Sequence, residues 1–153
     1  RIPDPTGYIA PEQLVLRDED VAKLASYLDE RRLLTVRLDI RPPAYQWVTV
    51  KVKLRAAPGL DRATIQKDVL ARLNRFLNPL VGGADATGWQ FGRGLFSSDV
   101  YQCLQGIANV QFVRSVEMYN ARPDGQPQGE PVESLDVVAH GVIASGKHLV
   151  EFI

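Results

Sequence analysis

The residues with the clearest capacity for catalysis or metal binding are the single cysteine, Cys103, and the two histidines, His140 and His148. A catalytic cysteine needs a nearby cation or histidine that lowers its pKa. Cys103 instead lies beside Leu104 in a helical pattern without such a signature, so a buried, inert thiol is favoured. Two histidines need carboxylates to hold zinc, and strand alternation puts His148 and Glu151 on opposite faces. The sequence therefore predicts no catalytic set, no metal site and no enzyme. An enzyme that uses Cys103 would need this thiol to be reactive and partly exposed.

A glycine-rich stretch at residues 78–99 is the second candidate for chemistry. It reads NPLVGGADATGWQFGRGLFSSD and contains five glycines. Glycine-rich loops can cradle phosphate, but this one lacks the Lys-Ser/Thr of a P-loop and contains no G-x-G-x-x-G. Asp99, at the start of the next helical pattern, would repel phosphate where the helix dipole attracts it. A structural loop whose glycines supply positive φ is therefore favoured, and no cofactor is expected.

The same stretch carries aromatic side chains that need a partner. A loop of this length inside a compact domain is unusual and often functional. Its aromatic residues must either fold back on their own core or dock against a neighbour, and Trp with Arg is a typical pair at protein interfaces. The predicted interface residues are Trp89, Phe91, Arg93 and Phe96. A loop that packs these residues internally is the equal alternative.

A row of basic side chains along two segments of alternating hydrophobicity suggests nucleic acid as a ligand. Its members are Arg37, Arg41, Lys51, Lys53 and Arg55. RNA-binding sheets stack bases on aromatic side chains, and here the outward phase offers only Trp47, with Tyr119 as a second candidate. The formal net charge is zero, which gives no long-range attraction for nucleic acid. A solvated sheet face or a protein contact is favoured, and a nucleic-acid-binding module that uses Lys51, Lys53 and Arg55 is the alternative function.

The length and composition of the chain fit one domain. At 153 residues the chain can build a proper hydrophobic core, and 45% hydrophobic and 24% charged residues are ordinary values. No apolar run reaches the roughly 18 residues of a membrane span, so no membrane contact is expected. Residues 1–17 begin with a proline-rich segment and suit a linker from an upstream domain. Residues 18–153 are expected to form a single α+β domain.

Hydrophobic periodicity predicts the elements that would position these residues. Helices are expected at residues 18–32, 61–77 and 97–105, and strands at residues 34–41, 46–55, 110–119 and 148–153. The short connection between the first two strands favours an antiparallel pair, and the last strand could pair with residues 110–119. Residues 122–131 are expected to be a polar loop, and residues 135–143 are ambiguous.

The second strand has the clearest alternation. Val48, Val50, Val52 and Leu54 are expected to point inward, with Trp47 and Thr49 in the solvated phase. The order of elements favours an antiparallel sheet of about four strands with helices packed on one face. The predicted fold class is therefore α+β, with a ferredoxin-like relative as the first topology.

Several ordered runs of residues resemble one known family. They are YLDERRLLT at 27–35, FLNPLVGG at 76–83, GWQFGR at 88–93, SDVY at 98–101 and ASGKH at 144–148. Together they resemble the C-terminal part of the baseplate assembly proteins, the baseplate J-like wedge proteins of contractile phage tails and contractile injection systems. The resemblance covers residues 7–153, and several ordered motifs make it more specific than any single match.

This resemblance implies a structural role. Wedge subunits associate with one another, and the wedges close into a ring around the tail hub, below the sheath. The expected partners are therefore other baseplate wedge subunits, with self-association as a further possibility, and neither membrane nor nucleic acid. Assembly in the bacterial cytoplasm into a phage tail or injection particle is implied. The resemblance agrees with the lack of a catalytic set, the net charge of zero and a loop suited to docking.

Overall fold

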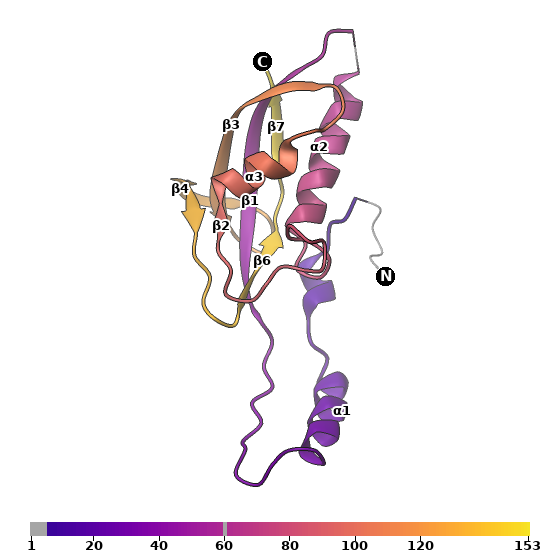
Figure 1. Ribbon diagram of the computed structural model, residues 1–153, viewed down its shortest axis with the longest axis vertical. Coiled ribbons are helices and arrows are strands. Elements are labelled where there is room, and N and C mark those ends of the chain that lie inside the picture. The colour runs from indigo at the N-terminus through magenta and orange to yellow at the C-terminus, as the bar shows by residue number, and fades with distance from the viewer. Residues whose placement is uncertain (1–5, 60) are drawn as a thin grey trace.

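Strand β1 (Ala44–Ala56) is the centre of the structure, a computed structural model that describes residues 6–59 and 61–153. The other elements, in chain order, are η1 (Pro11–Leu14), α1 (Asp18–Asp29), α2 (Arg62–Phe76), β2 (Leu95–Phe96), α3 (Ser97–Leu104), β3 (Val110–Ala121), β4 (Pro127–Val132), β5 (Ser134–Leu135), β6 (Gly141–Ser145) and β7 (Leu149–Phe152). Figure 1 shows the sheet with α2 and α3 at one end of the molecule and α1 at the other.

The main sheet is mixed and mostly antiparallel. Its strands follow the order β4-β3-β1-β6, and β7 pairs with β1 beyond the end of β6. β3 runs antiparallel to β1, whereas β6 and β7 are both parallel to it. The α+β class is confirmed, and the sheet has five strands among the described residues rather than about four.

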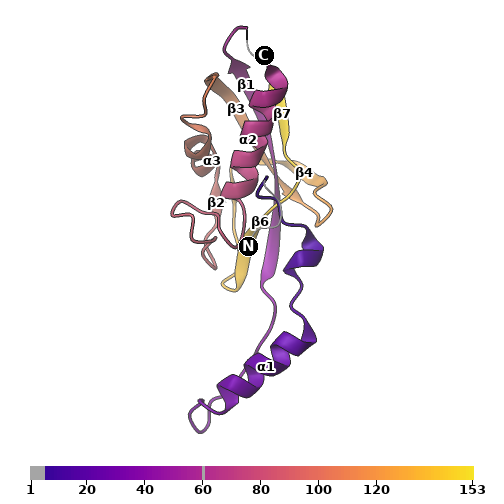
Figure 2. The same ribbon diagram turned by 90° about the vertical axis from the view of Figure 1, so that its right-hand side faces the viewer.

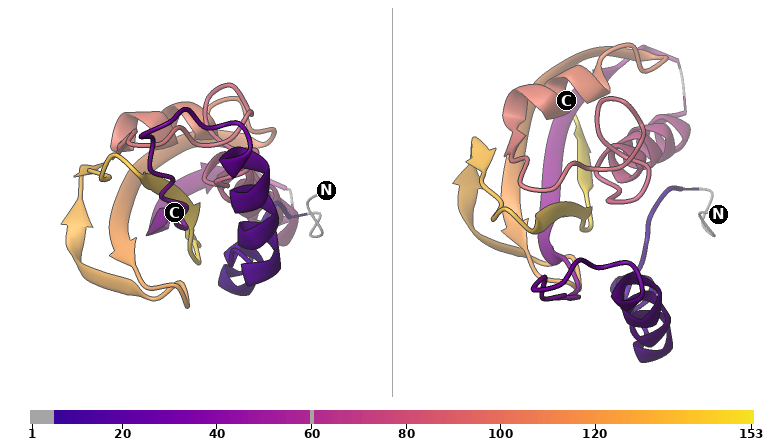
Figure 3. Two further views of the ribbon diagram at one scale, coloured as in Figure 1. Left: turned by 90° about the horizontal axis from the view of Figure 1, so that it is seen from below. Right: turned by 60° about the horizontal axis from the view of Figure 1, so that its bottom comes forward.

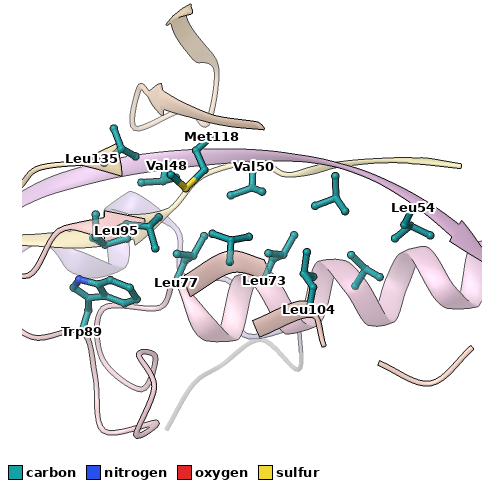
Figure 4. Packing of buried hydrophobic residues seen from close by; sticks show 14 of the residues in the cluster. Val48, Val50, Leu54, Leu73, Leu77, Trp89, Leu95, Leu104, Met118 and Leu135 are labelled. Atoms are coloured by element: carbon teal, nitrogen blue, oxygen red, sulfur yellow. The ribbon is translucent and has the colours of Figure 1, made fainter. Parts of the chain in front are cut away.

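The core forms between one face of β1 and the two helices α2 and α3. Val48, Val50, Val52 and Leu54 are fully buried, as their alternation predicts. They pack with Leu73 of α2 and other apolar residues in one cluster, shown in Figure 4. Each such side chain stabilises the fold by about 1.5–3 kcal/mol relative to exposure. This cluster fixes the helices on the sheet.

Helix α2 begins as its sequence predicts. The carboxylate of Asp61 accepts hydrogen bonds from the backbone N–H groups of Ala63 and Thr64 and from the hydroxyl of Thr64. These bonds stabilise the charged form and lower the pKa of Asp61. The buried side of the helix carries Ile65 and Val69. α3 and β3 also lie where hydrophobic periodicity predicts them.

Residues 15–43, here called the arm, extend away from the rest of the molecule. α1 descends along one side and residues 30–43 return along the other to enter β1 (Figures 1 and 2). None of the residues of α1, all of them described, is buried. We call residues 44–153 the body.

The predicted strand at residues 34–41 is wrong. This segment is irregular, and Leu34 is 94% exposed. Its alternation is real, but on the arm no described strand lies beside it, and an isolated strand has no ladder to stabilise it. The predicted antiparallel pair with residues 46–55 is wrong for the same reason. The predicted helix at residues 18–32 ends earlier, at Asp29.

The second face of β1 is less solvated than predicted. Trp47 is buried in a small cluster with Ala121 and Ala144, against Leu14. Thr49 is also buried, and its hydroxyl donates to the carbonyl of Gly125 at 2.9 Å. η1 and the turn at residues 122–126 therefore cover part of the face that the alternation marked as polar.

Two further predictions on the second half of the chain need correction. Residues 122–131 are not only a loop, because β4 pairs antiparallel with β3. The last strand pairs in parallel with β1 rather than with β3. Figure 3, which looks along the molecule, shows the sheet curved, with the β3–β4 hairpin bending away from α3. Both errors concern the pairing partners of strands. The local pattern of the sequence does not encode which strands pair.

Candidate interaction site

The glycine-rich stretch forms an ordered loop, residues 78–94, that joins α2 to β2; we call it the aromatic loop. Its first turn is organised by Asn78, which is buried. The Asn78 side-chain oxygen accepts from the N–H groups of Leu80 and Val81, at 2.8 and 3.2 Å, and its amide donates to the carbonyl of Gly7 at 2.8 Å. This one side chain ties the loop to the segment that precedes η1.

Two glycines let the loop fold tightly on the end of α2. A Cβ on Gly82 would lie 2.2 Å from the carbonyl oxygen of Phe76, which no side chain can tolerate. Gly83 has a φ of 78°, and its N–H donates to that same carbonyl at 2.8 Å. The glycines of this turn therefore bring the backbone close to itself, which agrees with the structural role predicted for them.

Trp89 lies inside the body and holds the loop down. It is 4% exposed, and its ring meets Phe76 edge to face, with 5.5 Å between ring centroids. Its Nε1–H donates to the carbonyl of Arg93 at 2.8 Å. The Arg93 guanidinium lies 5.4 Å from the Trp89 ring centroid and 3.7 Å from the Asp99 carboxylate. Trp89 and Arg93 thus act together in the intramolecular packing of the loop.

The other two predicted interface residues point outward. Phe91 is 64% exposed and Phe96 is 53% exposed. The backbone N–H of Phe96 donates to the Asp99 carboxylate at 3.1 Å, which fixes the residue at the start of α3 while its ring stays in solvent. The four predicted residues therefore divide into the buried Trp89 with the half-exposed Arg93, which shape the loop, and an exposed aromatic pair that is free to contact another protein.

Cys103 is buried and faces α2, as predicted for an inert thiol. Burial raises the pKa of Cys103 to about 11, although nearby Arg72 acts in the opposite direction. The thiol is therefore protonated at neutral pH. It has neither the exposure nor the lowered pKa that a nucleophilic cysteine requires.

His148 has a structural role that the sequence did not indicate. It stands between β6 and β7, where the parallel ladder along β1 is interrupted. Nδ1 of its ring accepts the backbone N–H of Val50 at 3.0 Å, in place of a strand carbonyl. Nε2 lies 2.8 Å from the Ser145 hydroxyl, which in turn donates to the side-chain oxygen of Asn74 on α2 at 2.9 Å. Because Nδ1 accepts, the neutral ring carries its proton on Nε2.

The surroundings of His148 keep it neutral. Desolvation lowers the pKa of this buried ring to about 3, from an ordinary value of 6.5. The hydrogen bonds run from the ring to Ser145 and onward to Asn74, so Ser145 is not activated as a nucleophile. The chain passes close to β1 just before His148: a Cβ on Gly146 would lie 2.8 Å from the Val48 carbonyl oxygen. This glycine is the one signal in the sequence for the contact.

Within the described residues, no group of three or more His, Cys, Asp or Glu side chains could hold a metal ion.

The predicted row of cations does not form a continuous surface. Arg37 and Arg41 belong to the arm, where Arg41 pairs with Asp39. On the sheet, Lys51 contacts Glu151 at 2.9 Å, and Lys53 lies 3.6 Å from Glu117. Arg55 and the ring of Phe112 face each other at 5.5 Å. Carboxylates from β3 and β7 therefore alternate with the lysines of β1.

The arm exposes large apolar side chains to solvent. Leu33 is 77% exposed, Tyr27 is 56% exposed and Leu24 is 43% exposed, in addition to Leu34 at the tip. They lie on and just beyond an amphipathic helix that does not pack extensively on any other described helix or strand. Exposed large apolar side chains that gather on one segment mark a candidate protein interaction site. The signal in the sequence was the Leu33-Leu34 pair directly after the helix.

Comparison with known proteins does not assign the chain to a family: no protein-family model matches it, and no curated protein matches it. Among the described residues, no helix has the length and apolar character needed to cross a membrane.

Proposed function

We propose that this chain is a structural component of a baseplate wedge in a contractile phage tail or contractile injection system, where it acts by protein–protein assembly. One observation carries the proposal: α1 is an amphipathic helix that buries no residue on its own body. Isolated helices of this length are marginal in water, and in proteins packing of the apolar face supplies most of their stability. A neighbouring subunit would supply that packing here.

The positions of the motifs support the same proposal. YLDERRLLT covers the end of α1 and the tip of the arm, and GWQFGR covers the aromatic loop. Both places expose large apolar side chains, Leu34 on the arm and Phe91 on the loop. Two of the runs that resemble wedge proteins therefore lie on surfaces suited to docking. The proposed partners are other wedge subunits, which would assemble with this chain in the bacterial cytoplasm.

The ferredoxin-like relationship remains part of the proposal. The chain leaves β1 through α2 and α3 before it returns antiparallel as β3, and both helices contribute buried residues to the cluster that covers β1. Helices that cover one face of a mostly antiparallel sheet are what a ferredoxin-like relative would share with this fold. The connection from β1 to β3 differs from the βαβ crossover of that motif, because it joins antiparallel neighbours. The nucleic-acid alternative has no observation in its favour, since the sheet lysines already face carboxylates.

The proposal is tested with Leu34→Asp in the longest natural form of the protein, co-expressed with the other components of its particle. Because Leu34 is exposed in the free chain, the variant should keep its melting temperature but enter sedimenting particles at least about tenfold less. Ser26→Asp, also exposed on the arm, is the matched control and should assemble normally. Normal assembly of Leu34→Asp would contradict a docking role for the arm.

A further inference from the structure

A cavity of about 450 Å³ opens between α2, the aromatic loop and α3. This volume lies within the range of about 300–1,000 Å³ that is usual for ligand sites. Three arginines from two segments converge on it: Arg72 and Arg75 from the last turns of α2, and Arg93 from the loop. In a chain with a formal net charge of zero, this concentration of cations in one concave site stands out.

The guanidinium groups retain donors for a ligand. Nε of Arg72 donates to the carbonyl of Cys103 at 3.1 Å, which positions the side chain. The guanidinium also acts on the Cys103 thiol, and its five N–H donors exceed these contacts. Among the described residues, Arg75 has no ion pair or hydrogen bond through its side chain. Asp99 is the one carboxylate that the described residues contribute to the lining, and at 3.7 Å from Arg93 it is beyond hydrogen-bond distance. The lining therefore carries an excess of two positive charges.

The rest of the lining is apolar. Phe76 and Val81 contribute hydrocarbon surface beside the arginines, together with Ala84 and Ala86 of the loop. An inorganic anion would satisfy the guanidinium groups but leave this surface in water. A ligand with both a carboxylate and an apolar group matches both parts, because arginine forks bind carboxylates through paired hydrogen bonds.

We propose that this cavity binds an acidic segment of a neighbouring protein, with a glutamate or aspartate carboxylate held by Arg72, Arg75 and Arg93 and an adjacent apolar side chain placed on Phe76 and Val81. That the ligand is a protein rests on the assembly function proposed above, whereas its anionic and apolar character follows from the lining. The backbone N–H of the exposed Phe96 donates to Asp99 of the lining, so one partner can contact both.

The test uses the 153-residue chain and two dye-labelled, capped hexapeptides of alternating leucine and glutamate or leucine and glutamine. Fluorescence anisotropy should show that the glutamate peptide binds at least about tenfold more tightly than the glutamine peptide, with an affinity that falls as salt is added. Arg75→Glu should weaken binding of the glutamate peptide at least about tenfold. Lys67→Glu makes the same charge change on α2 at an exposed position outside the cavity lining, and it should change binding less than about twofold.

Three outcomes would overturn the proposal. They are equal binding of the two peptides, equal weakening by Arg75→Glu and Lys67→Glu, and no binding of the glutamate peptide at millimolar concentration. Inorganic phosphate is tested alone: if it binds with the same dependence on Arg75 while the glutamate peptide does not, the site takes small anions instead. This binding test is separate from the assembly of Leu34→Asp, so failure of the cavity and failure of the wedge proposal are distinguishable.

Discussion

Helices α1 and α2 have similar sequence patterns and opposite environments. Both show apolar residues at helical spacing, yet α2 buries Ile65, Val69 and Leu73 on the sheet while α1 buries no residue within the described chain. The same division recurs in the aromatic loop, where Trp89 is inside and Phe91 is outside. An apolar stripe shows that a surface needs a partner, but it does not show whether that partner belongs to the same chain.

The largest effect is expected inside the aromatic loop. Trp89→Ala should lower the free energy of unfolding by about 3–5 kcal/mol, because it removes a buried ring and its contact with Phe76. Phe91→Ala should change it by less than about 0.5 kcal/mol, because the ring is exposed. Urea denaturation followed by circular dichroism measures both values. Similar losses for the two variants would show that the loop is not divided in this way.

The second largest effect is expected when the same substitution is made on α2 and on α1. Leu73→Ala on α2 should cost about 2–5 kcal/mol, since the side chain is fully buried in the core. Leu24→Ala on α1 makes the same chemical change at an exposed position and should cost less than about 0.5 kcal/mol in the free chain. If Leu24→Ala proves as destabilising as Leu73→Ala, the arm is folded onto the body in solution and the contrast fails.

A pH-dependent effect on stability is expected in the body. The pKa of His148 is about 3 in the fold and near 6.5 in the unfolded chain. The contribution of His148 to the free energy of unfolding is therefore complete above pH 6.5. It is lost as the pH falls from 6.5 towards 3, by up to about 1.4 kcal/mol per pH unit. Chemical denaturation at a series of pH values measures this slope.

Two variants test whether His148 causes this dependence of stability on pH. His148→Gln keeps an acceptor near the N–H of Val50 but cannot titrate, so its stability should depend less on pH in this range. His140→Gln is the matched control, because His140 is exposed, and it should keep the wild-type slope. A wild-type slope in His148→Gln would show that other groups cause the acid sensitivity.

Sequence reasoning succeeded where structure depends on neighbours along the chain. The stripe of α2 with its cap at Asp61, and the alternation of Val48, Val50 and Val52, contain the information that their packing uses. It failed where two distant segments must meet. Residues 34–41 alternate, but no described strand pairs with them, whereas the polar residues of β4 form a strand because β3 supplies its ladder.

The candidate site follows the same rule. Trp89 and Arg93 could be singled out by type and by their place in a long loop, but not their packing against Phe76 and Asp99. The convergence of Arg72, Arg75 and Arg93 was not predicted, because the cavity exists only after α2, the loop and α3 have packed. His148 was considered only as a metal ligand and was disfavoured in that role. Its bond to the Val50 N–H was not predicted, because it depends on a break between two strands.

The continuity between the arm and β1 has a mechanical consequence. The returning leg of the arm enters β1 at Ala44, where β1 pairs with β6. From Val48 onward β1 is held by β3 on one side, and β6 and then β7 follow on the other. A pull on the tip of the arm would load the hydrogen bonds on both sides of this strand in shear, all at once, rather than peel them apart one by one. A subunit attached to the arm could therefore transmit force to the middle of the sheet without first unravelling its edge.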